Sequence, residues 1–67
     1  MNYTVRIINE GRDKSDMIYQ ANSFDSANHF FWSIVSSVKD STWNWQLTLE
    51  SNSNGVATNL YHFVKKL

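Results

Sequence analysis

The chain has 67 residues and no cysteine, so neither disulfides nor a zinc site built on cysteine ligands can hold its fold. Six basic residues balance six acidic ones, and this neutral total gives no overall field that would attract nucleic acid or an anionic membrane. Three Trp, three Tyr and four Phe residues supply large areas for burial. We expect one small domain over residues 1–67 with a thin hydrophobic core.

The sequence also bears on location and assembly. The N-terminus lacks a basic region followed by a long apolar run, and no apolar stretch approaches the length of about 20 residues that spans a bilayer. The absence of cysteine agrees with a reducing compartment, so we expect a cytoplasmic protein. Dimerisation often adds stability at this size, and a monomer and a homodimer both remain open.

Two short strands are expected first along the chain. Residues 3–9 centre on Val5, Ile7 and Ile8, β-branched residues that favour strands. The polar stretch 10–15 predicts a loop. The apolar run 17–21 then predicts a second strand that pairs back on the first.

The next segment predicts a helix. Asn22 or Ser23 supplies a capping side chain, and Asp25 places a carboxylate in the first turn, where the helix dipole favours it. Apolar residues then recur at the three-and-four spacing of one helical face. They are Phe24, Ala27, Phe31, Ile34, Val35 and Val38. We expect the helix to end near Lys39.

A hairpin is expected at the C-terminal end. Residues 43–50 alternate large apolar and polar side chains, which predicts a strand with one buried face. Asn54-Gly55 suits the positive φ angles of a type I′ turn, and residues 56–64 return as a fourth strand. The predicted fold class is α+β: a four-stranded antiparallel sheet with one amphipathic helix on one face, in ββαββ order.

The turn also predicts the register of this hairpin. The helix-facing pairs would be Leu49 with Leu60, Leu47 with His62, and Trp45 with Val64. The core would also include Trp43, and His62 would be half-buried near the sheet edge. The open face would carry Tyr61, Phe63 and Lys65 beside Asn44, Gln46 and Thr48. A shift by one residue would exchange the two faces.

No residue pattern predicts catalysis, a metal or a cofactor. Asp25 could orient His29 four residues later, but no recognisable nucleophile accompanies them. His29 and His62 fall on different elements without a third ligand. With only Gly11 and Gly55, no glycine-rich phosphate loop is possible. We therefore expect a protein that is not an enzyme.

Two features indicate an interaction surface. Trp32 lies off the apolar face of the helix, where it either anchors a protein interface or packs over the edge of the sheet. The open-face aromatics would form a surface for stacking and hydrogen bonding, suited to single-stranded nucleic acid or to a protein, unless they pack under a loop or against a second subunit. The basic residues are too few, and too mixed with acidic ones, for a strong nucleic-acid site. The basic residues considered for such a site are Arg6, Arg12, Lys14, Lys65 and Lys66.

As a whole, the chain resembles small phage-encoded anti-CRISPR proteins. The order of elements, the helix sequence Phe-Asp-Ser-Ala-Asn-His-Phe-Phe at 24–31, the Trp-rich strand and the Asn-Gly turn are similar to type I-F inhibitors of this size. The resemblance implies an inhibitor without catalysis or cofactor that occupies a surface of a CRISPR-Cas complex in the host bacterial cell. The neutral charge argues against mimicry of DNA.

The resemblance and the predicted exposure together give the candidate binding residues. Inhibitors of this group use basic and polar residues on the sheet and loops. The predicted partner-binding set is Arg6, Arg12, Lys14, Trp32, Gln46, Thr48, Tyr61, Phe63 and Lys65. A protein partner is the favoured interpretation. A small nucleic-acid-binding or regulatory module is the alternative.

Overall fold

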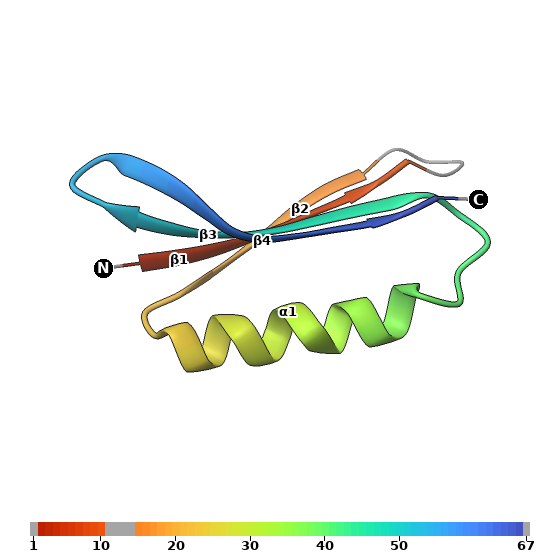
Figure 1. Ribbon diagram of the computed structural model, residues 1–67, viewed down its shortest axis with the longest axis horizontal. Helices are drawn as coiled ribbons and strands as arrows, with labels where there is room; N and C mark the ends of the chain where they lie inside the picture. Colours follow the sequence, from red (N-terminus) through yellow and green to blue (C-terminus); the bar gives the residue numbers. More distant parts are fainter. Residues whose placement is uncertain (1, 11–14, 67) are drawn as a thin grey trace.

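A computed structural model describes residues 2–10 and 15–66. Its elements are β1 (Asn2–Asn9), β2 (Ser15–Ala21), α1 (Phe24–Val38), β3 (Trp45–Ser53) and β4 (Val56–Lys65). The strands form one antiparallel sheet in the order β2-β1-β3-β4. Helix α1 lies along one face, and none of the described elements covers the other (Figure 1). The predicted α+β class and the ββαββ order are confirmed.

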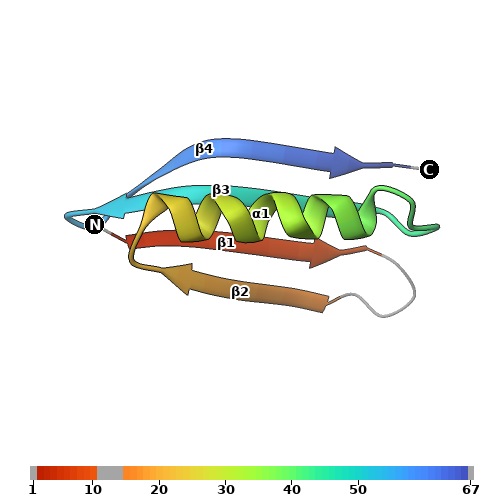
Figure 2. The same ribbon diagram turned by 90° about the horizontal axis from the view of Figure 1, so that it is seen from below.

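The core lies between α1 and the two central strands. Figure 2 shows the helix running over β1 and β3, with β2 and β4 at the edges of the sheet. The buried apolar residues are Val5, Ile7, Ala27, Phe31, Val35, Val38, Leu47 and Leu49. The alternation of β1 and β3 sends every second side chain to this face, which is why both strands contribute to the core. No helix in the described part of the chain is long and apolar enough to cross a membrane.

Helix α1 begins and ends close to the predicted residues. Ser23 is the N-cap, and its side chain accepts a hydrogen bond from the backbone N–H of Ser26 at 3.2 Å. Asp25 lies in the first turn, and Lys39 is the C-cap. Four residues of the predicted apolar face are buried, so the three-and-four spacing located the buried side of the helix correctly.

The predicted start of β3 is wrong. The strand runs from Trp45 to Ser53, and Trp43 precedes it with 41 % of its surface exposed, so Trp43 is not a core residue. Backbone groups after the helix find local partners, because Ser41 N–H donates to the Val38 carbonyl and Trp43 N–H donates to the Ser41 hydroxyl. The chain then reaches the end of β1, where Glu10 N–H donates to the Asn44 carbonyl at 2.9 Å, and β3 begins at the next residue.

The turn between β3 and β4 has the predicted geometry. Asn54 and Gly55 have φ angles of 52° and 79°, and Ser53 pairs with Val56 across them. Two successive positive φ angles match the right-handed twist of the flanking strands in a type I′ turn. The Asn-Gly prediction is confirmed.

The predicted register is wrong beyond the first four pairs. Pairing follows the prediction as far as Glu50 opposite Asn59, and a β-bulge then places Leu49 opposite Tyr61, so that Leu60 is the extra residue. The remaining pairs are Leu47 with Phe63 and Trp45 with Lys65.

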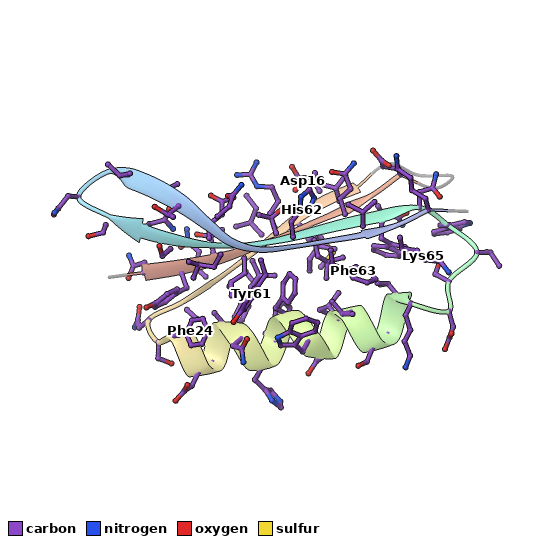
Figure 3. The ribbon with its side chains drawn as sticks, in the orientation of Figure 1. Asp16, Phe24, Tyr61, His62, Phe63 and Lys65 are labelled. Atoms are coloured by element: carbon purple, nitrogen blue, oxygen red, sulfur yellow. The ribbon has the colours of Figure 1, made fainter. Side chains whose placement is uncertain are left out.

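The bulge exchanges the two faces of β4. Figure 3 shows Tyr61, Phe63 and Lys65 directed toward the helix and His62 directed away from it. His62 is exposed, and Phe63 packs against the core. This register buries an aromatic ring where the unshifted one would bury an imidazole, which costs more to desolvate.

We expect Phe31→Ala to destabilise the fold by about 3 to 5 kcal/mol, because Phe31 is fully buried and its loss leaves a cavity in a thin core. Trp43→Ala should cost clearly less than Phe31→Ala, because 41 % of the Trp43 surface is exposed whereas Phe31 is fully buried. Urea denaturation followed by circular dichroism measures both. Equal losses in the two variants would contradict the observed start of β3.

Gly55→Val should destabilise by about 1 to 2 kcal/mol, because a side chain is strained at this positive φ. An added Cβ meets no atom within 4 Å, so the expected cost comes from the backbone conformation and not from a clash of that atom. Asn54→Gly is the matched control and should be close to neutral, because glycine readily adopts a positive φ. Thermal unfolding of both variants tests the turn, and a Gly55→Val protein that melts like the wild type would contradict it.

Candidate functional site

The structure divides the predicted partner-binding residues between the two faces of the sheet. Arg12 and Lys14 lie outside the described residues. The open face carries Arg6, Gln46 and Thr48, and the helix side carries Trp32, Tyr61, Phe63 and Lys65. The expected single surface of Tyr61, Phe63 and Lys65 beside Gln46 and Thr48 does not form, because the bulge separates them.

The open face is a mixed polar and apolar surface. Arg6 on β1 pairs with Ile18 of β2 on one side and with Thr48 of β3 on the other, and Thr48 in turn pairs with His62 of β4. These four positions form one row across the sheet. The row holds no aromatic ring other than the imidazole, so it is not the stacking platform that the sequence predicted.

Two further open-face residues are engaged within the molecule. Gln46 donates a hydrogen bond from Nε2 to Oε1 of Glu10 at 3.0 Å. Asn52 donates from Nδ2 to the hydroxyl of Thr4 at 2.7 Å, and Thr4 is buried although it lies on the face that no helix covers. These hydrogen bonds hold the polar side chains of the open face in place.

Lys65 and Phe63 stabilise the fold. The ammonium of Lys65 donates to the backbone carbonyl of Lys39, the C-cap of α1, at 2.7 Å. A cation is favourable there because the last carbonyls of a helix carry its negative dipole end. Phe63 lies opposite Leu47 and is partly buried against the core. Both side chains lie on the helix side of the sheet and not on the open face that the sequence predicted.

An aromatic cluster forms where α1 meets β4. Phe31 points into the core, and Trp32, about 100° further around the helix, reaches toward β4. The Trp32 ring lies 5.1 Å from Phe31 and 5.9 Å from Tyr61, measured between ring centroids. Tyr61 also contacts Phe31 at 5.9 Å and Phe24 at 6.3 Å. The bulge makes this cluster possible, because without it Tyr61 would be on the other face.

The outer part of this cluster is held in place and still open to solvent. Trp32 donates from Nε1 to Oδ1 of Asn28 at 3.0 Å, which fixes its ring on the helix. Trp32 is 48 % exposed and Tyr61 is 39 % exposed. We call these two residues the aromatic edge. The Trp32 ring packs on Phe31 and Tyr61 at the margin of the core, and about half of its surface remains exposed.

The aromatic edge has the chemistry of an interface anchor. Trp and Tyr supply large contact areas with few rotatable bonds and a polar atom at one end. Here the rings rest on Phe31, so little conformational entropy remains to be lost when a partner covers them. Val64 of β4 is 44 % exposed but pairs with Gln46 and lies on the open face, so it is not part of the aromatic edge.

Sequence reasoning missed exposed apolar residues on both edge strands of the sheet. Leu60 and Val64 were expected to face the helix, and both are at least 40 % exposed. Met17 and Ile18 in β2 are exposed by 58 % and 57 %. Apolar residues stand at 60, 61, 63 and 64, a pattern that fits neither face strictly and is the only sign of the bulge.

Residues 2–10 and 15–66 contain no group of three or more acidic or histidine side chains placed to hold a metal. No pocket is found among the residues that the structure describes. Comparison of the chain with known protein families, with characterised proteins and with solved structures finds no match.

Adjacent residues of β4 provide a test of the site. Tyr61→Ser should destabilise by about 2 kcal/mol, because it removes ring contacts with Phe24, Phe31 and Trp32. His62→Ser should change stability by less than about 0.5 kcal/mol, as is usual for an exposed side chain. Chemical denaturation measures both. A larger loss of stability in His62→Ser than in Tyr61→Ser would indicate that β4 pairs with β3 without the bulge.

Proposed function

We propose that the protein is a non-catalytic binding protein that covers a surface of a protein partner with its aromatic edge. One observation carries the proposal: Trp32 and Tyr61 are held in contact by the core, yet each leaves more than a third of its surface exposed. Anchors of this kind dominate protein interfaces, where Trp and Tyr are the most enriched hot-spot residues along with Arg.

The resemblance to type I-F anti-CRISPR proteins supplies the class of partner. The protein would act as a phage-encoded inhibitor that occupies a surface of a CRISPR-Cas effector complex in the cytoplasm of the host bacterium. Its neutral charge favours recognition by shape and apolar contact over long-range attraction. The aromatic edge takes the place of the sheet surface that the sequence predicted, because Tyr61 now stands beside Trp32.

The alternative, a nucleic-acid-binding module, receives less support. Its two expected stacking residues, Tyr61 and Phe63, face the helix, and Phe63 is partly buried. An aromatic platform for bases requires exposed ring faces beside a basic groove.

Binding to a purified type I-F effector complex tests the proposal. Trp32→Ala should weaken binding about 30-fold, the equivalent of about 2 kcal/mol for a hot-spot aromatic. The matched control is His29→Ala, on the same helix at an exposed position outside the aromatic edge, and it should bind as the wild type does. Thermal unfolding of each variant shows that the folded fraction is complete during the measurement.

Each result has a distinct meaning. No binding of the wild type to the complex would overturn the proposed class of partner. Binding that survives Trp32→Ala unchanged would overturn the aromatic edge as the contact surface. Binding to single-stranded DNA with a steep salt dependence would favour the nucleic-acid alternative.

A further inference from the structure

Strand β2 is an edge strand that is exposed on both faces. Among the described strands it pairs only with β1. All five residues from 16 to 20 are exposed, and the exposed fractions of Met17, Ile18 and Tyr19 are 58 %, 57 % and 37 %. The outer side of such a strand presents backbone N–H and C=O groups that can pair with another strand.

β2 lacks the features that protect edge strands from pairing. Residues 15–21 contain no Lys, Arg or Pro. Its register with β1 runs without a shift from Ala21 to Ser15, so no bulge bends it away. The other edge strand, β4, has the bulge at Leu60 and ends at Lys65. Strand addition is therefore favoured at β2 rather than at β4.

We propose that two copies of the chain pair antiparallel through β2, around a twofold axis that passes beside Ile18. The two sheets would join into one of eight strands, with both copies of α1 on the same face. A twofold axis makes the contact self-complementary, so each residue meets a position of the second copy fixed by symmetry.

The sequence of β2 suits pairing with itself. Centred on Ile18, the register places Ile18 opposite its own copy, Met17 opposite Tyr19, and Asp16 opposite Gln20. Asp16 is the one residue of the strand that is charged at neutral pH, and it meets a neutral amide, so no like charges face each other. The zero net charge of the chain adds no long-range repulsion between copies.

The helix side of the joint is apolar. Phe30 stacks on Tyr19 with ring centroids 4.1 Å apart and an interplanar angle of 17°. In the proposed register the Met17 side chain of one copy lies against this tyrosine of the other, and a thioether beside an aromatic ring is a favourable contact. The same contact occurs twice, once on each side of the axis. This match of Met17 with Tyr19 is the reason to assign a second copy, and not an unrelated strand, to the edge.

The dimer is independent of the proposed function. β2 and β4 are opposite edges of the sheet, so pairing through β2 leaves Trp32 and Tyr61 uncovered. Failure of either proposal would leave the other standing.

Sedimentation equilibrium across roughly 1 μM to 1 mM, the range of weak association, tests the dimer. The wild type should change reversibly from monomer to dimer. Ile18→Lys should remain a monomer throughout, because two ammonium groups would meet across the axis. Val64→Lys places the same charge at an exposed position of β4 and should associate like the wild type. Circular dichroism checks that both variants are folded.

A charge-reversal experiment identifies the register. Ile18→Glu should also be a monomer alone, and an equimolar mixture with Ile18→Lys should recover the dimer, because opposite charges then face each other. A wild type that stays monomeric at 1 mM would overturn the proposal. A dimer that is lost in Val64→Lys but kept in Ile18→Lys would overturn it equally, since it would use the β4 edge. Failure of the mixture to associate would exclude a register centred on Ile18.

Discussion

The structure depends on the burial of one face of a four-stranded sheet by a single helix. A helix is about 10 Å wide with its side chains, whereas four strands spaced by about 4.8 Å span about 14 Å between their outer axes. The helix therefore covers β1 and β3 and only partly reaches β2 and β4 (Figure 2). The two neighbours of Phe31 in the helix reach the edge strands. Phe30 stacks on Tyr19 of β2, and Trp32 contacts Tyr61 of β4. The exposure of the edges follows from this mismatch in width.

The bulge in β4 lets one margin be filled with aromatic rings. With a regular register, the helix side of β4 would carry Leu60 and His62, and an imidazole would need a hydrogen-bonding partner beside Leu47. The extra residue turns Tyr61 and Phe63 inward and leaves Leu60 and Val64 partly exposed. The bulge therefore has two effects on β4. It brings aromatic rings into contact with the helix, and it leaves apolar side chains exposed to solvent.

The sequence was sufficient to predict elements with a strong period or a specific turn. The helix face around Phe31, a cap at Asn22 or Ser23 and the Asn54-Gly55 turn followed from spacing and local chemistry, as did the ββαββ order. The bulge was not predictable, since one extra residue leaves almost no trace in a strand where both faces hold apolar residues. Because the predicted surface depended on that register, Tyr61, Phe63 and Lys65 were assigned to the open face, whereas they lie on the helix side.

The two edges differ in the kind of partner that each suits. At β2 the strand is regular, so its backbone can extend the sheet, and side chains need only match in alternate positions. At β4 the bulge interrupts the strand, and side chains beside it provide the main contact surface. Trp32 and Tyr61 contribute to the core and remain exposed, so the contacts that hold the helix on the sheet also fix the shape offered to a partner. Under the two proposals, folding stability and partner binding would be coupled at β4 and largely separable at β2, where Ile18 is exposed on the face that α1 leaves open.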